Sequence, residues 1–354
     1  MIYYIIIITI ILFASSELLK QNSKIKFFCQ NISMLILIIF SGFAYEVGTD
    51  WVEYKEIFYK QIPLYGTNFS LYRIESLYVG LMMFFKYLCN NYQIFQFIII
   101  SIILVSVFRF LKTNTQYPLI GLMLYMRTGY ILDTFYALRQ GLVMSIFIYI
   151  LDYIKQKKYY RYYLINFFLI FIHKSAIFLL IAPILNLNIK KRVMLLLVFF
   201  STILAKMTWI NYFITNIIVY LPMKYRMSLE PYLETKVELN IFSLSLKLLI
   251  ILYFIVDKDY FLIKNKNYKI ILNGAILNYI LGTAFWEIII IGSRVASYFF
   301  IFNCAMMSMF FIRIKKANIY IKICCFILYI FLILYSYKNN FYAESGLLPY
   351  KFML

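Results

Sequence analysis

The stretch QIFQFIIISIILVSVFRFL, residues 93–111, carries a single charged side chain, Arg109, and decides the fold. A helix needs about 20 predominantly apolar residues, or about 17 at the short end, to cross a bilayer. Comparable stretches recur at 1–19, 27–45, 75–89, 135–154, 193–209, 241–256, 270–291, 295–312 and 317–337. This pattern predicts an all-α polytopic membrane protein.

The composition excludes a water-soluble protein. Of the 354 residues, 64% are hydrophobic and 14% are charged, and the mean hydropathy is +0.81. A soluble domain averages about 45–50% apolar and about 25% charged residues. The net charge is +20, but the basic residues gather in short turns between apolar runs, as in cytoplasmic loops of membrane proteins. Nucleic-acid binding is therefore not expected.

Neither a metal site nor a cofactor is expected. The five cysteines form no CxxC pair, and His173 is the only histidine, so the ligand set of an ordinary zinc site is missing. P-loop, GxGxxG and HExxH patterns are absent as well, which argues against the nucleotide chemistry of soluble enzymes.

The basic turns set the predicted orientation. We place the clusters at 20–26, 155–161, 190–192, 258–269 and 313–316 in the cytoplasm. The acid-rich segments near 46–75 and 209–240 then become outer loops. Residues 113–134 and 162–189 need bent or re-entrant hairpins, the second with its tip near His173. We expect one membrane domain over 1–354 with about 10–12 spanning helices.

An ionisable residue in an apolar run calls for a structural or functional explanation. Inserting its charged side chain at the centre of a bilayer costs about 2.5–3.5 kcal/mol on translocon scales. Asp50 follows Gly48 at the outer end of a span. It shares one helical face with Tyr54 and Phe58 if a helix begins here. One interpretation makes Asp50 an N-cap, with Glu53 completing a capping box. The other makes its carboxylate a general base on a sugar hydroxyl.

Further charged positions also have two interpretations each. Arg139-Gln140 and Arg294 either snorkel to the outer leaflet or bind an anion, because arginine offers bidentate donors to phosphate oxygens. In the first interpretation of Arg294, Glu287 would be its pairing partner, because it lies on the same helical face at i−7. His173-Lys174 either packs as a hydrogen-bonded pair or binds an anion or moves a proton. Lys86 is expected to snorkel from the end of its span.

Taken in order, these pieces resemble the EpsG family of Wzy-like polysaccharide polymerases, bacterial membrane proteins of O-antigen, capsule and exopolysaccharide loci. The pieces are Val47-Gly48-Thr49-Asp50-Trp51 with Tyr54 and Phe58, Glu75 at the start of a span, Arg139-Gln140, Lys157-Lys158-Tyr159-Tyr160, His173-Lys174-Ser175-Ala176, Arg294 with Tyr298-Phe299, and Pro349-Tyr350-Lys351. Two positions depart from the family pattern. An arginine that the family often carries is missing from Phe43-Ala44-Tyr45-Glu46, and Gly141 stands where a larger aliphatic residue is usual.

The resemblance implies a glycosyltransferase without a cofactor in the bacterial cytoplasmic (inner) membrane. Such a protein transfers the growing glycan from undecaprenyl diphosphate to the next lipid-linked repeat unit at the outer face. Its fold would be a glycosyltransferase-C-like helical bundle. Its catalytic base would be Asp50 or His173. The diphosphate and sugar would be bound by Arg139, Gln140, Lys174, Arg294, Trp51, Tyr54 and Glu75.

The implied partners are the undecaprenyl-diphosphate-linked oligosaccharide and membrane lipid, with a flippase and a chain-length regulator as further candidates. Two other function classes stay open. A flippase or other transporter of lipid-linked oligosaccharides would often show repeat symmetry, which we do not find in the sequence. A membrane O-acyltransferase of the glycan would use His173 as its base.

Overall fold

The computed structural model describes residues 2–19, 22–62, 74–206, 216, 220, 223, 240–286, 289–338 and 346–352. Within these ranges the secondary structure is helical, apart from turns and a single antiparallel bridge between Ala44 and Phe352. The contacts divide the chain into two compact units. The first comprises 1–180 and 307–354, and the second comprises 181–306.

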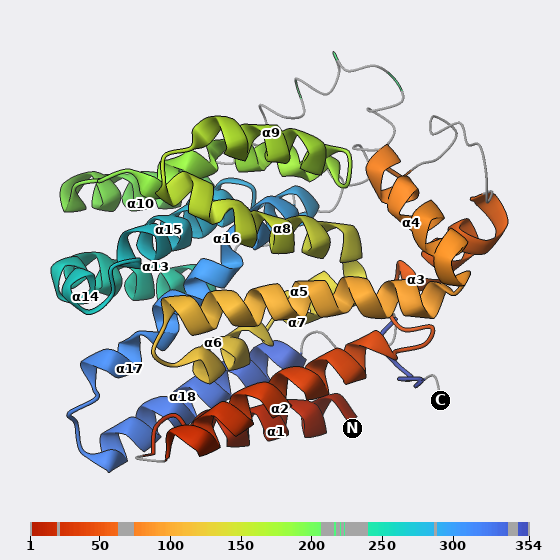
Figure 1. Ribbon diagram of the computed structural model, residues 1–354. Helices are drawn as coiled ribbons and strands as arrows, with labels where there is room; N and C mark the ends of the chain where they lie inside the picture. The colour runs from red at the N-terminus through yellow and green to blue at the C-terminus, as the bar shows by residue number, and fades with distance from the viewer. Residues whose placement is uncertain are drawn as a thin grey trace. The chain divides into compact units, whose positions relative to one another are not determined.

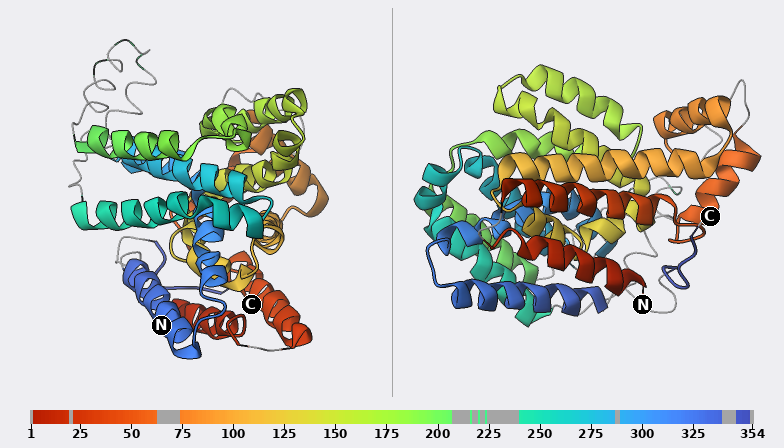
Figure 2. Two further views of the ribbon diagram at one scale, coloured as in Figure 1. Left: turned by 90° about the vertical axis from the view of Figure 1, so that its left-hand side faces the viewer. Right: turned by 60° about the horizontal axis from the view of Figure 1, so that its bottom comes forward.

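The first unit contains most of the helices (Figures 1 and 2). They are α1 (Ile2–Ser15), α2 (Ser23–Gly42), α3 (Trp51–Glu56), the π-helix η1 (Ile57–Gln61), α4 (Ser76–Cys89), α5 (Tyr92–Asn114), α6 (Pro118–Tyr125), α7 (Gly129–Ile131), the π-helix η3 (Leu132–Tyr136), α8 (Leu138–Lys155), α9 (Tyr159–Ile170), α17 (Phe310–Arg313) and α18 (Ile319–Lys338). The second unit contains α10 (Lys191–Lys206), α13 (Ile241–Val256), α14 (Lys258–Lys264) and α15 (Tyr268–Ala284). The 3-10 helix η4 (Lys174–Asn186) and α16 (Ile289–Ser308) each cross from one unit to the other along the chain.

The predicted apolar stretches are helices. Each of the ten overlaps mainly with one helix, namely α1, α2, α4, α5, α8, α10, α13, α15, α16 and α18 in chain order, although 207–209 lies outside the described residues and 295–312 also reaches α17. The boundary that differs most is that of 270–291, because α15 ends at Ala284 and α16 begins at Ile289. An apolar run buries its own backbone polar groups best as a helix, which is why composition located these elements.

Asparagine side chains fix three of the helix starts. Asn91 accepts hydrogen bonds from the backbone N–H groups of Gln93 and Ile94 at 2.9 and 3.3 Å, at the beginning of α5. Asn22 caps α2 and Asn240 caps α13 in the same way. A short side-chain oxygen satisfies the free N–H groups of a first helical turn, so these helices begin at defined residues.

In the first unit α5 lies between α2 and α8 (Figure 1). Its buried side chains, such as Phe95, Ile99 and Ile103, pack in the interior of this unit. Large apolar side chains also lie on outer surfaces, among them Leu196 of α10 and Phe331 of α18, which are 69% and 64% exposed. Helices that are apolar on all sides suit a lipid environment, and with the composition they make this chain a helical membrane protein.

Three helical stretches in the described ranges are long and apolar enough to cross a membrane, Ser23–Gly42, Tyr92–Asn114 and Arg294–Arg313. Shorter apolar helices accompany them at Ile2–Ser15, Ser76–Cys89, Lys174–Asn186, Ile241–Val256 and Ile319–Tyr335. The number of spans and the single membrane domain stay predictions. Of the expected outer loops, 63–73 and most of 209–240 lie outside the described residues.

Two buried charged side chains hold helix ends. The Lys86 ammonium donates to the carbonyl oxygens of Phe58, Tyr59 and Ile62, at 2.8, 3.1 and 2.6 Å. The prediction that Lys86 snorkels is therefore wrong. The carbonyl groups at the end of η1 accept the hydrogen bonds that a snorkelling ammonium would donate to water at the membrane interface.

Glu17 holds the start of α6. Its carboxylate accepts from the backbone N–H groups of Leu119 and Ile120 at 3.0–3.1 Å, and from the Gln30 amide at 3.3 Å. A carboxylate at a helix N-terminus satisfies free N–H groups and complements the helix dipole. Burial raises the pKa of Glu17 from 4.5 to about 7, although these hydrogen bonds lower it in part.

Candidate functional site

The segment between α2 and α3 places Asp50. Gly48 has a φ of +97°, and a Cβ atom at this position would lie 2.1 Å from the carbonyl oxygen of Phe135 in η3. Only glycine combines this backbone conformation with so close an approach. The chain therefore turns tightly against η3 and delivers Asp50 to the start of α3.

Asp50 occupies the N-cap position of α3, but its side chain makes no capping hydrogen bond. Its carboxylate accepts instead from the hydroxyl of Tyr54, one turn later, at 3.1 Å. The shared face of Asp50 and Tyr54 is thus confirmed, whereas the capping-box interpretation is wrong. The reason is that the Asp50 backbone is helical, with φ −86° and ψ −12°, whereas an N-cap side chain reaches the free N–H groups from an extended backbone.

Tyr54 links Asp50 to Arg139. The Nε of Arg139, in the first turn of α8, donates to the Tyr54 hydroxyl oxygen at 2.8 Å. The guanidinium carbon also lies 5.5 Å from the centre of the Tyr54 ring. One phenol therefore accepts from an arginine and donates to a carboxylate, which aligns the three groups in a row.

Glu75 extends this row to the turn between α9 and η4. Its carboxylate forms an ion pair with Nη1 of Arg139. Its other oxygen accepts from the backbone N–H of Lys174 at 3.1 Å and lies 3.4 Å from Nδ1 of His173. The backbone N–H of Leu77 donates to the Phe171 carbonyl at 2.9 Å, which fastens the start of α4 to the same turn.

The protonation states follow from burial and from the neighbouring charges. Burial alone would raise the pKa of Glu75, but the hydrogen bond with His173 and the charge of Arg139 outweigh it and lower the pKa from 4.5 to about 2. Burial raises the pKa of Tyr54 well above its ordinary 10. At neutral pH Glu75 is therefore an anion, and Tyr54 keeps the proton that it donates to Asp50.

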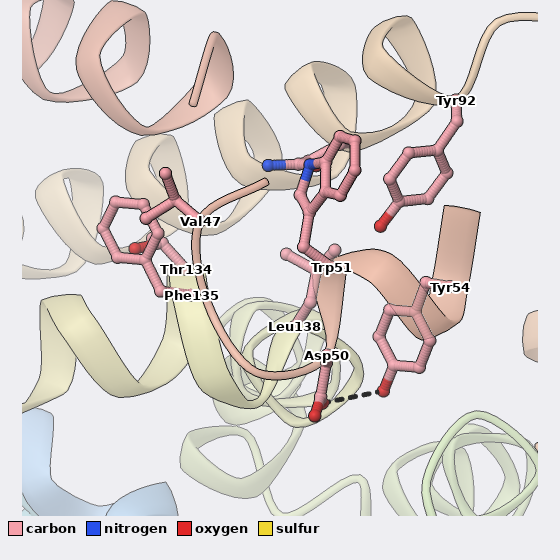
Figure 3. Close-up of a pocket in the computed structure, with 9 residues that line it drawn as sticks. Val47, Asp50, Trp51, Tyr54, Tyr92, Thr134, Phe135 and Leu138 are labelled. Carbon is pink, nitrogen blue, oxygen red and sulfur yellow. Dashed lines mark hydrogen bonds between the residues drawn. The ribbon is translucent and has the colours of Figure 1, made fainter. Parts of the chain in front are cut away.

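A pocket opens beside Asp50 (Figure 3). Its empty volume, including the open mouth, is about 220 Å³, and it is lined by Val47, Asp50, Trp51, Tyr54, Tyr92, Gln96, Thr134, Phe135 and Leu138. Figure 3 shows Asp50 and Tyr54 joined by their hydrogen bond at one side of it. Within the part of the chain that the structure describes, two buried atoms of this lining have no hydrogen-bond partner, Nε1 of Trp51 and Oε1 of Gln96. One donor and one acceptor without partners suit a hydroxyl group.

The model of the EpsG family matches residues 26–352, nearly the whole chain. The chain belongs to the EpsG family. This is a family of the Wzy-like polymerase type, so the protein is a membrane protein of polysaccharide biosynthesis. No match was found among curated proteins or among solved structures.

The EpsG chain brings five of the predicted site residues into one row, Asp50, Tyr54, Arg139, Glu75 and His173. Lys174 contributes its backbone N–H, whereas its side chain is exposed. Trp51 is buried between Tyr45 and Tyr92, at ring-centroid distances of 4.8 and 5.6 Å. Gln140 is buried inside the first unit. The roles predicted for all of these residues stay predictions.

Arg294 lies in the second unit, on α16, with an exposed side chain. Its convergence with Arg139 stays a prediction. Glu287, the predicted partner of Arg294, lies outside the described residues. The departure from the family pattern at Gly141 has a local reason, because a Cβ there would lie 2.6 Å from the carbonyl oxygen of Asp133.

Sequence reasoning missed the pocket lining that comes from α5 and η3. Gln96 belongs to a mostly apolar helix. Its amide was the signal that could have identified it, because a polar group inside a spanning helix needs a partner or a function. Thr134 and Phe135 gave no such signal. Their place beside Asp50 depends on the contact between Gly48 and η3.

Proposed function

We propose that this EpsG protein is a polysaccharide polymerase of the bacterial cytoplasmic membrane. It transfers the growing glycan from undecaprenyl diphosphate to the non-reducing sugar of the next lipid-linked repeat unit at the outer face. Membership of the EpsG family and the apolar helices support this reaction class. The reaction needs a base for the attacking hydroxyl and a cation for the leaving diphosphate.

The observation that carries the proposal is the row from Asp50 through Tyr54 and Arg139 to Glu75. The three successive contacts of this row join residues that lie 4, 85 and 64 positions apart in the sequence. Charged residues are few in this chain. Ionisable groups held together in a membrane protein usually serve transport or catalysis. A carboxylate and a guanidinium separated by one phenol supply both groups that this glycosyl transfer requires.

In the proposed reaction Asp50 acts as the base. The acceptor hydroxyl gives its proton to the Asp50 carboxylate while its oxygen bonds to the anomeric carbon of the donor sugar. The bond from that carbon to the diphosphate oxygen breaks, and the diphosphate leaves with the electron pair. Arg139 has five N–H donors and uses two for Tyr54 and Glu75, so donors remain for the diphosphate.

Asp50 is preferred over His173 as the base because of their surroundings. Asp50 is half-buried and lines the pocket. The His173 side chain is 11% exposed, and its Nδ1 faces the Glu75 carboxylate. We assign His173 and the Lys174 backbone to holding Glu75, which in turn orients Arg139. Preorganised groups of this kind stabilise charge as it develops in a transition state.

The glycosyltransferase-C-like bundle of about 10–12 spans, with re-entrant hairpins at 113–134 and 162–189, belongs to the same proposal. The pairing of α9 with η4 supports the second hairpin. The hydroxyl of Tyr162 donates to the Leu179 carbonyl at 2.6 Å, and the amide of Asn166 donates to the Ala176 carbonyl at 3.4 Å. The chain thus reverses direction at the turn that contains His173.

The test is a gel of surface glycan from a strain that lacks the gene, with the wild type or a variant restored. We expect the deletion to lose the long-chain ladder while one repeat unit is still transferred. Asp50→Asn should reduce long chains by about 100-fold or more, in the range of a lost general base. Glu56→Gln is the matched control, because Glu56 forms only an exposed pair with Lys60.

Other outcomes would identify the other function classes. An unchanged ladder in the deletion strain would reject the polymerase. Accumulation of lipid-linked repeat units on the cytoplasmic side would indicate a flippase. Glycan of normal length that lacks an acyl group would indicate an O-acyltransferase.

A further inference from the structure

The C-terminal segment (346–352) lies against the 44–48 segment that leads into Asp50 (Figures 1 and 2). The backbone N–H of Tyr45 donates to the Lys351 carbonyl, and that of Gly48 donates to the Gly346 carbonyl, both at 2.9 Å. Ala44 and Phe352 form an antiparallel bridge. Because these contacts are backbone hydrogen bonds, they set the path of the 44–48 segment directly.

Side chains anchor the C-terminal segment in the first unit. Leu347 is fully buried, and its carbonyl accepts from the Tyr3 hydroxyl at 3.0 Å. The Tyr350 ring stacks on Phe40 with centroids 4.5 Å apart, and its hydroxyl donates to the Phe40 carbonyl at 2.5 Å. These contacts come from α1 and α2, and none of them involves a residue assigned to the reaction.

The 44–48 segment is thus enclosed from two sides. Gly48 meets the carbonyl of Phe135 on one side and the backbone of Gly346 on the other. Asp50 makes no side-chain capping bond, and α3 holds it only through Tyr54, whose hydroxyl donates to its carboxylate and whose backbone N–H donates to its carbonyl. The location of its carboxylate therefore depends on two supports, Tyr54 within α3 and the 44–48 backbone that leads into α3.

We propose that the C-terminal segment is a positioning element of the active site, which holds the 44–48 segment against η3 and so keeps Asp50 in place. The catalytic part of this inference rests on the proposed function. Leu347 and Tyr350 are the positioning residues, and neither touches a group assigned to the reaction. Displacing a catalytic group by about 1 Å can reduce activity about 100-fold.

The first measurement does not depend on activity. Val47 is 1% exposed. In a background without the five native cysteines, Val47→Cys is labelled with a maleimide in the detergent-purified protein. We expect slow labelling in the full chain and labelling several-fold faster in a chain that ends before Gly346 or carries Tyr350→Ala. Equal rates in all three proteins would overturn the proposal.

The second measurement uses a reversible cross-link. Because Tyr45 N–H donates to Lys351, Ala44 and Phe352 are a non-hydrogen-bonded pair, whose Cα atoms in an antiparallel bridge lie about 4.5 Å apart. This separation lies within the range that a disulfide spans. Ala44→Cys with Phe352→Cys, placed in the same cysteine-free background with Tyr350→Ala, therefore fastens the segment when oxidised and releases it when reduced.

We expect Tyr350→Ala to lower glycan polymerisation about 10-fold or more, and the oxidised cross-link to restore most of it. Reduction should remove the rescue. Tyr335→Ala is the matched control, because the Tyr335 ring on α18 is 64% exposed and stacks on Phe331, which is exposed as well. Full activity of Tyr350→Ala, or no gain on oxidation, would overturn the positioning role.

The two measurements separate failure of this inference from failure of the proposed function. If the wild-type gene does not restore long glycan, the polymerase proposal fails, and Val47 labelling still decides whether the C-terminal segment holds the 44–48 segment. If labelling shows protection but the cross-link gives no rescue, the positioning role in catalysis is wrong.

Discussion

Glu75 and Arg139 form an ion pair between the N-cap of α4 and the first turn of α8, across 64 residues of sequence. Their side chains are 8% and 20% exposed. Because little water reaches either side chain, the stability of each buried charge depends on the opposite charge of its partner. The pair also couples His173 to the Tyr54–Asp50 end of the row.

Glu75→Ala is expected to lower the free energy of unfolding by about 3 kcal/mol, because removing one partner of a shielded ion pair leaves the other charge uncompensated. Thermal unfolding of the detergent-purified protein measures the change. Glu56→Ala serves as the control, because the Glu56–Lys60 pair is exposed, and it should unfold at the wild-type temperature. An equal shift in the two variants would contradict the structural role of Glu75.

Tyr54→Phe removes the hydroxyl that connects Arg139 to Asp50 and keeps the buried ring. We expect long-chain glycan to fall about 10-fold or more, since a misoriented base and cation lose their preorganisation. The unfolding free energy should fall by about 1–2 kcal/mol, the range for one lost buried hydrogen-bond partner.

Tyr45→Phe is the matched control for this variant. The Tyr45 hydroxyl accepts from Lys55 at 3.0 Å and has no bond to Asp50. Tyr45→Phe should retain polymerisation. If the two variants lost activity equally, the row through Tyr54 would have no special role.

Gly48→Ala is expected to abolish polymerisation and to destabilise the fold by about 1–3 kcal/mol or more, because its φ of +97° is unfavourable for alanine and its Cβ would meet the Phe135 carbonyl at 2.1 Å. Gly80→Ala in α4 is the control, since a Cβ there meets nothing within 4 Å. That variant should be neutral or up to about 1 kcal/mol more stable. Circular dichroism melts and the glycan gel distinguish the two results.

Glu17 makes stability depend on pH in a defined direction. In the folded protein its carboxyl keeps a proton up to about pH 7, because burial raises its pKa from 4.5. Between these values the folded state binds more protons than the unfolded state, so this group makes stability fall as pH rises from 4.5 to about 7. Above that range its contribution is constant. Its charged neighbours are Lys26 and, at higher pH, Tyr117.

Glu17→Gln should remove this fall. Melting temperatures of the wild type and the variant, compared across the same pH interval, give the contribution of Glu17 as a difference. Parallel curves would show that the Glu17 carboxyl does not hold its proton in the folded protein.

Much of the helical framework could be predicted, because it depends on local composition. Each predicted apolar stretch is largely helical, since a long apolar run in a membrane satisfies its backbone best as a helix, but the breaks within 270–291 and 295–312 were not predicted. The Asp50–Tyr54 contact was also predictable, because it is a local i, i+4 relationship. Lys86 was misread, since its acceptors lie more than 20 residues away, at the end of η1.

The candidate site could be predicted as a set of residues but not as an arrangement. Glu75, Arg139 and His173 stood out because charged groups are rare in this chain. Their pairing could not be read from spacing, because no periodicity connects positions that lie 64 and 98 apart. Tyr54 is predicted to bind the diphosphate or sugar, which stays a prediction, and only the structure shows that its hydroxyl bonds to Arg139 and Asp50.

The sequence by itself determined that this protein is helical and membrane-embedded, which residues carry its scarce charges, and which family pattern they follow. Those properties depend on the transfer of individual side chains and backbone groups into an apolar medium, which composition specifies. Only the tertiary structure decided that Glu75 pairs with Arg139, that η3 lies against Gly48, and that the C-terminal segment pairs with the 44–48 segment. These contacts depend on how the helices pack, and packing is fixed by the shapes of many surfaces together.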